Sequence, residues 1–200
     1  LDTEWRLAAS STQRMQDLVS DVVRVLREES ASADYEISLD ELVQMISAKM
    51  CPRAKQVEVR FETQLRARGL LTNRDANLIM LILENLIHNA IQATAKGKAV
   101  TLEVTAVEDQ ILYEVRDQGS GLPAGYERAL FKPCQSTKEG GTGIGLAISK
   151  QLAYALGAEL ELKTSSPRGC VFALRVPKSL FVGELDPPSR TKLGGSQIST

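Results

Sequence analysis

Several features that mark large classes of protein are scarce in this sequence of 200 residues. Aromatic residues make up only 4% of it, there is a single histidine, and no apolar run approaches the roughly 18 residues of a membrane-spanning helix. Acidic and basic residues nearly balance, for a formal net charge of −1 at pH 7. No overall positive charge therefore favours nucleic acid or an anionic membrane surface, and we expect contact with neither.

Cysteine is also scarce. The three cysteines, Cys51, Cys134 and Cys170, lie far apart, so their spacing fits no metal-ligand motif, and their odd number argues against a disulfide framework. Reduced thiols in a cytoplasmic protein are the expectation. The sequence opens at Leu1 and not at a methionine, so we expect part of a longer protein, which leaves open a membrane anchor upstream.

The pattern of apolar residues predicts helices and strands in clusters. Residues 3–29 have a helical stripe, and Ser38 to Glu41 forms a capping box that should start a helix ending near Pro52. Alternating patterns predict strands over 57–61, 100–104 and 111–115, and a closing hairpin over 159–163 and 170–176. Because strands cluster in neighbouring pairs with helices between the clusters, the fold class should be α+β, a two-layer sandwich with helices on one face.

The most informative stretch is the predicted helix that includes residues 78–93. Wound at about 100° per residue, it gathers its polar residues in one sector, opposite a broad apolar face. These polar residues are Glu84, Asn85, His88, Asn89 and Gln92. Asn85 and Asn89 lie one turn apart, and carboxamide oxygens suit Mg²⁺ that already sits on phosphates. A solvated polar face with satisfied amides is the alternative.

Two glycine-containing segments follow. Asp117 stands at a predicted strand end before Gly119 and Gly121, where a carboxylate could accept a hydrogen bond from an exocyclic amine or cap its own turn. Residues 140–145 contain four glycines and precede a helix, an arrangement in which backbone N–H groups can bind an anion. No Lys-Ser/Thr pair follows, so this is not a Walker A loop.

Taken together and in this order, these motifs resemble the ATP-binding domain of bacterial sensor histidine kinases, which has the Bergerat ATP fold. The resemblance covers about residues 38–177. The matching segments are Glu84-Asn85-Leu86-Ile87-His88-Asn89-Ala90 for the N box, Asp117-Gln118-Gly119-Ser120-Gly121 and Gly141-Thr142-Gly143-Ile144-Gly145-Leu146 for the two glycine boxes, Leu130-Phe131-Lys132-Pro133 for the F box, and Ser136-Thr137-Lys138 for the lid.

The resemblance implies ATP and Mg²⁺ as cofactors and assigns roles to residues. Asn89, helped by Asn85, would coordinate Mg²⁺, Asp117 would hold the adenine amine, and Glu84 could polarise an attacking imidazole or pair with His88. The predicted catalytic residues are Glu84, Asn85 and Asn89, and the predicted ATP-binding residues are Asn85, Asn89, Gln92, Asp117, Gly119, Gly121, Ser136, Thr137, Lys138, Gly141, Thr142, Gly143, Ile144, Gly145 and Leu146. Lys138 could equally be a solvated lid lysine. Gln92 stands where the family often has a basic residue.

The resemblance also implies an organisation. Residues 1–30 would be the second helix of a dimerisation and phosphoacceptor hairpin, 31–37 a linker, 38–179 the catalytic domain, and 180–200 a disordered tail. The expected partners are a second copy of the chain, bound through that hairpin, and the receiver domain of a response regulator. His88, on the ATP-binding helix, is poorly placed to be the phosphoacceptor.

Three other functions compete with a histidine kinase. A serine-kinase anti-sigma factor shares the fold, but the long helix before residue 30 argues against it. A chaperone or topoisomerase-type ATPase would continue into a transducer domain, for which few residues remain. A non-catalytic nucleotide-sensing module is disfavoured by the intact Asn89, Asp117 and glycines 141, 143 and 145.

Overall fold

The computed structural model describes residues 35–123, 125–126, 130–131 and 144–182. The predictions for residues 3–29, for most of the lid and for nearly all of the tail lie outside these residues. The elements are β1 (Glu36–Ser38), α2 (Leu39–Gln56), β2 (Arg60–Arg66), β3 (Leu70–Thr72), α3 (Asn73–Ala93), β4 (Ala99–Val107), β5 (Gln110–Arg116), α4 (Gly145–Ala155), β6 (Glu159–Ser166), β7 (Gly169–Pro177), a 3₁₀ turn (Lys178–Leu180) and β8 (Phe181–Val182).

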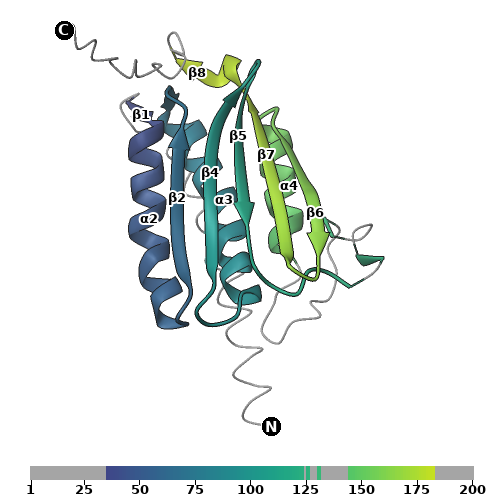
Figure 1. The fold of residues 1–200 in the computed structure, drawn as a ribbon. Coiled ribbons are helices and arrows are strands. Elements are labelled where there is room, and N and C mark those ends of the chain that lie inside the picture. The colour runs from purple at the N-terminus through teal and green to yellow at the C-terminus, as the bar shows by residue number, and fades with distance from the viewer. Residues whose placement is uncertain (1–34, 124, 127–129, 132–143, 183–200) are drawn as a thin grey trace, which may run out of the picture.

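The main sheet has five strands in the order β2-β4-β5-β7-β6. Strand β2 pairs parallel to β4, and the remaining neighbours are antiparallel. Helices α2, α3 and α4 cover one face of this sheet, with α3 between the other two (Figure 1). The prediction of an α+β two-layer sandwich is thus confirmed, including the helices on one face and the closing β6–β7 hairpin.

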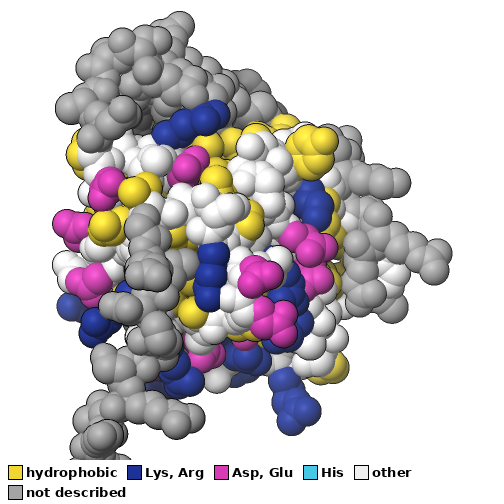
Figure 2. Space-filling view, turned by 90° about the horizontal axis from the view of Figure 1, so that it is seen from above, with side chains coloured by type: hydrophobic (Ala, Val, Ile, Leu, Met, Phe, Trp, Pro, Cys, Tyr) yellow, Lys and Arg dark blue, Asp and Glu magenta, His cyan; other side chains and the backbone are white. Residues whose placement is uncertain are grey.

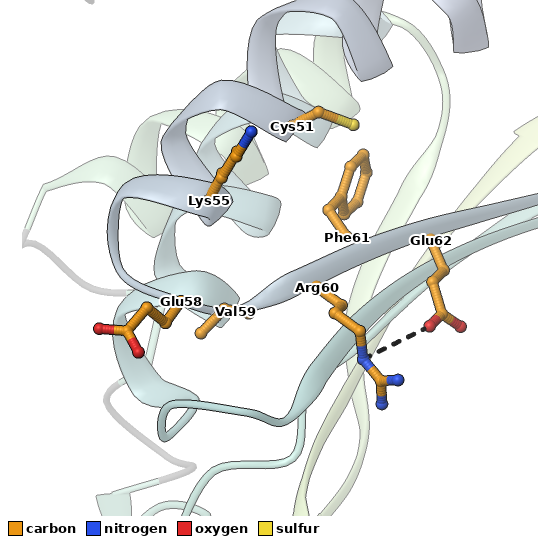
Figure 3. Close-up of a pocket in the computed structure, with 7 residues that line it drawn as sticks. All are labelled: Cys51, Lys55, Glu58, Val59, Arg60, Phe61 and Glu62. Carbon is orange, nitrogen blue, oxygen red and sulfur yellow. Dashed lines mark ion pairs between the residues drawn. The ribbon is translucent and has the colours of Figure 1, made fainter.

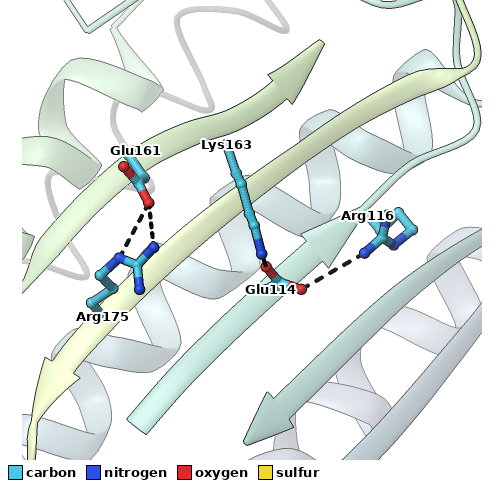
Figure 4. A network of polar contacts seen from close by, with 5 residues as sticks. All are labelled: Glu114, Arg116, Glu161, Lys163 and Arg175. Atoms are coloured by element: carbon cyan, nitrogen blue, oxygen red, sulfur yellow. Dashed lines mark hydrogen bonds and ion pairs between the residues drawn. The ribbon is translucent and has the colours of Figure 1, made fainter. Parts of the chain in front are cut away.

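The two faces of the sheet differ in character because successive side chains of a strand point to opposite sides. Toward the helices lie fully buried apolar side chains such as Leu102, Tyr113 and Leu174. On the opposite face, charged residues pair across strands (Figure 4). Lys163 Nζ lies 2.5 Å from Glu114 Oε1, and the Arg175 guanidinium lies 2.8 Å from Glu161 Oε1. Among the described residues, the face away from the helices therefore has a layer of ion pairs over the strands.

Helix α3 begins at a side-chain cap. Thr72 caps it, with its hydroxyl oxygen accepting from the Asp75 N–H at 3.2 Å. Leu78, Leu81 and Ile82 are all buried, so this part of the helix is largely covered. The helix ends at Ala93, because Thr94 is extended and forms a bridge with Gly119.

Helix α2 shows where the prediction was wrong. Its capping box forms as expected, but the helix continues through Pro52 to Gln56. Pro52 is exposed, and the turn after it buries Ala54, whose carbonyl oxygen accepts from the N–H of Val57. This buried contact and this hydrogen bond offset the backbone hydrogen bond that proline removes from the helix. The following strand consequently begins at Arg60 and not at Val57.

A second, three-stranded sheet was not predicted. Its order is β1-β3-β8, and all its strands have at most three residues, too short for an alternating pattern to be visible. Strands β1 and β8 extend ordered structure into the segments predicted as linker and tail. Seen from the end of the molecule where these strands lie, basic and acidic side chains of the described residues are interspersed (Figure 2).

Candidate functional site

Helix α3 contacts both glycine-containing segments. Near its middle, the Asn85 carboxamide lies against Gly145 at the start of α4. At its end, the Ala93 carbonyl lies against Gly119, 2.5 Å from where a Cβ of residue 119 would be. The two contacts are separated by eight residues, about 12 Å along the helix axis. The structure thus brings residues from three distant parts of the sequence together around one helix.

Asp117 follows β5 and is buried. Its Oδ1 accepts a hydrogen bond of 2.7 Å from the backbone N–H of Gly119, so the carboxylate caps its own turn. Its Oδ2 makes no hydrogen bond recorded among the described residues. One oxygen therefore orders the turn, while the other is available to accept a hydrogen bond from a bound group. The two alternatives left open for Asp117 are compatible with each other.

The tip of the β6–β7 hairpin holds this turn from the other side. Gly121 has φ +75°, and a Cβ there would overlap the carbonyl of Ser166. The N–H of Leu122 donates to Ser165 Oγ at 2.9 Å, and the N–H of Asp117 donates to the Cys170 carbonyl at 3.0 Å. The turn is consequently fixed between α3 and the hairpin, and Gly121 is required by close packing as well as by its backbone conformation.

The start of α4 is packed against α3 by a polar contact. Asn85 Nδ2 donates to Ser149 Oγ at 2.8 Å, and a Cβ at Gly145 would lie 2.6 Å from Asn85 Oδ1. The N-cap residue of α4 is Ile144, whose aliphatic side chain accepts no hydrogen bond from the helix. N–H groups at the start of a helix can bind an anionic ligand.

The remaining predicted residues of α3 differ in exposure. Asn89 and His88 are half-buried and Gln92 is exposed. Glu84 is only 9% exposed, and its Oε2 pairs with Lys49 Nζ of α2 at 2.5 Å, a partner that the sequence did not indicate. Its Oε1 is buried without a hydrogen-bond partner among the described residues.

Several predicted site residues lie outside the described residues: Ser136, Thr137, Lys138, Gly141, Thr142 and Gly143. Of the F-box segment, Leu130 is buried in the core, and the Phe131 ring lies 5.3 Å from Lys150 Nζ of α4, a cation–π contact. Within the second glycine box, Ile144, Gly145 and Leu146 are described and half-buried.

Sequence reasoning missed three residues that support the site: Lys49, Ser149 and Gly169. Gly169 closes the turn after Ser166, and a Cβ there would overlap the carbonyl of Asp117. The Ser-Pro-Arg-Gly run is a turn signal that could have located it in the hairpin, although not its contact with Asp117. Ser149 and Lys49 lie at helical positions where nothing in the spacing indicates a polar partner on α3.

A separate open hollow lies between the end of α2 and the start of β2 (Figure 3). Cys51 and Phe61 face it, and Arg60 and Glu62 form an ion pair of 3.9 Å at its edge. Its lining contains none of the predicted site residues. It is therefore not part of the candidate site.

Metal binding at the candidate site would depend on a bound phosphate ligand. Among the described residues there is no group of three or more His, Cys, Asp or Glu side chains that could hold a metal ion. Asn85 and Asn89 offer neutral oxygen atoms, which fit Mg²⁺ when phosphate oxygens supply the charge.

No helix among the described residues is long and apolar enough to cross a membrane.

Comparison with protein families matches residues 74–180 to the family described as histidine kinase-, DNA gyrase B- and HSP90-like ATPases. Among curated proteins, the chain is 28% identical over 162 residues to sporulation kinase C of Bacillus subtilis, covering 80% of this chain and 38% of that protein. It is 29% identical over 180 residues to the sensor histidine kinase MtrB of Mycobacterium tuberculosis, covering 86% of this chain and 32% of MtrB. The chain thus spans about a third of these relatives.

Solved structures share the fold. Full-length ShkA in complex with AMPPNP superposes with a TM-score of 0.67 at 23% identity, covering 87% of this chain and 37% of ShkA. The catalytic domain of the histidine kinase ThkA gives a TM-score of 0.64 at 23% identity, covering 74% of this chain and 97% of ThkA. At this identity the likeness establishes the fold alone.

Proposed function

The chain belongs to the family of histidine kinase-, DNA gyrase B- and HSP90-like ATPases, and we propose that residues 38–179 are the ATP-binding catalytic domain of a two-component sensor histidine kinase. The observation that carries the proposal is the contact of α3 with both glycine segments, at Gly119 and at Gly145. The curated relatives named above are kinases, which favours this function over a gyrase-like or chaperone-like ATPase.

In this proposal different residues bind different parts of the nucleotide. Asp117 binds the adenine amine through Oδ2, because Oδ1 is already committed to Gly119. The N-terminus of α4, with Gly141, Thr142, Gly143, Ile144, Gly145 and Leu146, binds the phosphates. Asn89 and Asn85 hold Mg²⁺, Gln92, Ser136, Thr137 and Lys138 complete the ATP site, and Gly119 and Gly121 fix the exit of the lid.

Catalysis then depends mainly on how the γ-phosphate and the attacking group are positioned. ATP supplies the γ-phosphoryl group and Mg²⁺ neutralises the charge that develops on it. The two ends of the nucleotide would be bound by segments that both pack against α3, which would orient the γ-phosphate for in-line attack. Glu84 is held by Lys49, and its Oε1 is the oxygen left to polarise an attacking imidazole.

The wider function follows from this assignment. The phosphoryl group would pass to a histidine on a separate helix hairpin and from there to the receiver domain of a response regulator. Residues 1–30 would contribute to a homodimer through that hairpin, and the domain would work in the cytoplasm. These parts of the proposal rest on relatives such as MtrB, which is a sensor histidine kinase by name.

Phosphotransfer tests the proposal. The chain has a single histidine, His88, on the nucleotide-binding helix. We would incubate the chain with γ-labelled ATP and Mg²⁺, alone and with a two-helix hairpin that carries a His-Glu pair. Acid-labile, base-stable label should appear only on the hairpin, and Asn89→Ala should abolish it.

Two outcomes would count against this account. Label on the chain itself that disappears in His88→Ala would show that the acceptor is misplaced. Failure to label the hairpin with the wild-type chain, when the chain binds ATP, would favour a nucleotide-sensing role over a kinase.

A further inference from the structure

The contact between Asn85 and Ser149 joins α3 to α4 inside the candidate site. Asn85 Nδ2 donates to Ser149 Oγ at 2.8 Å, and Ser149 is 2% exposed. Ser149 lies four residues after Gly145, so both stand on the same side of α4, one turn apart. At the first of these positions a Cβ would lie 2.6 Å from Asn85 Oδ1. The carboxamide thus lies along the first turn of α4.

This arrangement gives the two ends of the carboxamide different surroundings. The Asn85 NH₂ group donates to the hydroxyl oxygen of Ser149. Because a serine hydroxyl can also donate, it is the N–H groups at the start of α4 that decide which end of the carboxamide faces them. The oxygen end is consequently turned toward Gly145, at the N-terminus of the helix. A carboxamide rotated by 180° would place Oδ1 against Ser149 and its NH₂ group at the helix start, where N–H groups already point outward.

We infer that Ser149 is a positioning residue, which holds Asn85 so that its carboxamide oxygen faces the metal and phosphates. The inference rests on the proposed function, because it assumes that Mg²⁺ and the phosphates lie at the start of α4. Ser149 itself touches neither. Since Ser149 is buried, solvent has little access to replace the lost hydroxyl, and Ser149→Ala should leave Asn85 without a fixed orientation.

A purely structural role for Ser149 would affect folding but not the dependence of ATP binding on metal. The discriminating quantity is therefore the ratio of ATP dissociation constants measured without and with Mg²⁺. We would determine this ratio by calorimetry for the wild type, Ser149→Ala, Asn85→Ala and the double variant. Ser47→Ala is the matched control, because Ser47 is also a helical serine whose hydroxyl is hydrogen-bonded, but to its own helix, at 2.7 Å from the Val43 carbonyl of α2.

We expect Ser149→Ala to weaken binding of Mg²⁺–ATP about 5- to 10-fold, the effect of one lost hydrogen bond, and to leave metal-free binding nearly unchanged. Asn85→Ala should behave likewise, and the double variant should be no worse than Asn85→Ala alone, since Ser149 acts through Asn85. Ser47→Ala should not change the ratio. Ser149→Cys, which keeps the volume but accepts weakly, should be intermediate and provides a second test if the alanine variant folds poorly.

Three results would overturn the inference. Effects of Ser149→Ala and Asn85→Ala that multiply in the double variant would show that Ser149 acts independently. Equal weakening with and without Mg²⁺, or none, would reduce Ser149 to a packing residue. A wild-type chain that does not bind ATP would contradict the proposed function itself, and this inference with it.

Discussion

The α-carbon of Gly169, in the turn of the β6–β7 hairpin, packs against the backbone carbonyl of Asp117, so that a Cβ at position 169 would overlap it. Gly169 also has φ +126°, a conformation that L-residues rarely adopt. We therefore expect Gly169→Ala to displace Asp117, to lower the free energy of unfolding by about 2 kcal/mol, and to weaken ATP binding. Urea unfolding and nucleotide titration would measure the two effects.

Gly97→Ala is the matched control for this prediction. Gly97 also has a positive φ, +80°, but a Cβ there would meet nothing within 4 Å. Gly97→Ala should lower the free energy of unfolding by about 1 kcal/mol, through backbone strain, and leave the ATP affinity unchanged. Equal loss of affinity in both variants would contradict the proposed contact between Gly169 and the site.

The ion pair between Lys49 and Glu84 should contribute more than a surface pair. Glu84 is 9% exposed, so Lys49→Ala leaves a buried carboxylate without its partner. Because the lysine side chain is 43% exposed, we expect a loss of about 1–2 kcal/mol, less than for a fully buried pair. Adding Glu84→Gln to Lys49→Ala should restore part of the loss, since the remaining group is then neutral.

The exposed pair between Lys96 and Glu58, at 2.6 Å, provides the comparison for Lys49. Lys96→Ala should cost less than about 0.5 kcal/mol. Similar losses for the two lysine variants in urea unfolding would show that the Lys49 pair has no special weight.

Tyr113 is fully buried, and its hydroxyl has no hydrogen-bond partner among the described residues. Tyr113→Phe should therefore raise the free energy of unfolding by about 1 kcal/mol. Burial also raises the pKa of Tyr113 far above its usual value. The wild type should thus lose stability as the pH rises above about 10, where the unfolded chain ionises, and the phenylalanine variant should lose less.

Tyr154, which is 83% exposed, gives the reference for this substitution. Tyr154→Phe should change stability by less than about 0.5 kcal/mol at any pH. Thermal melts of both variants measure the difference, and a destabilised Tyr113→Phe would mean that the hydroxyl is satisfied.

The capping box of α2 should make the stability of the fold depend on pH in the acidic range. Ser38 N–H and Oγ–H donate to Glu41 Oε2 at 2.8 and 2.7 Å, and these bonds lower the pKa of Glu41. Because the pKa of Glu41 is lower in the folded than in the unfolded chain, Glu41 stabilises the fold at pH values above its unfolded-state pKa. This stabilisation is lost as the pH falls through the folded-state pKa. Ser38→Ala should cost about 1 kcal/mol at neutral pH and less near pH 3.5. A cost that does not depend on pH would exclude the contribution of Glu41.

Local patterns predicted much of this fold because they report burial. The strands around Leu102, Tyr113 and Leu174 alternate in sequence as they do in the sheet, and the capping box at Ser38 starts α2. The short strands β1, β3 and β8 form no pattern of their own and exist because they pair with each other. Pro52 follows the same rule, since a tertiary contact at Ala54 favours the helix that local preference would end.

The candidate site was predictable to the extent that its residues occur in ordered motifs. Asp117 and Asn85 could be found in this way, whereas Ser149 and Gly169 could not. Their importance comes from groups more than 50 residues away in sequence, 64 residues for the Asn85–Ser149 bond. Nothing in the local composition around them specifies that neighbour.

The most direct test of the ATP site is the recognition of the adenine amine by Asp117. Asp117→Asn keeps an oxygen for the Gly119 N–H but replaces the second acceptor by a donor, so the turn should survive while the amine loses its partner. We would titrate the wild type, Asp117→Asn and the exposed control Asp109→Asn with ATP and with inosine triphosphate, which lacks the amine. The wild type and Asp109→Asn should bind ATP about 10- to 100-fold more tightly than inosine triphosphate, and Asp117→Asn should bind both weakly and nearly equally. Undiminished ATP binding by Asp117→Asn, or a wild type that does not distinguish the two nucleotides, would contradict the assignment of this site.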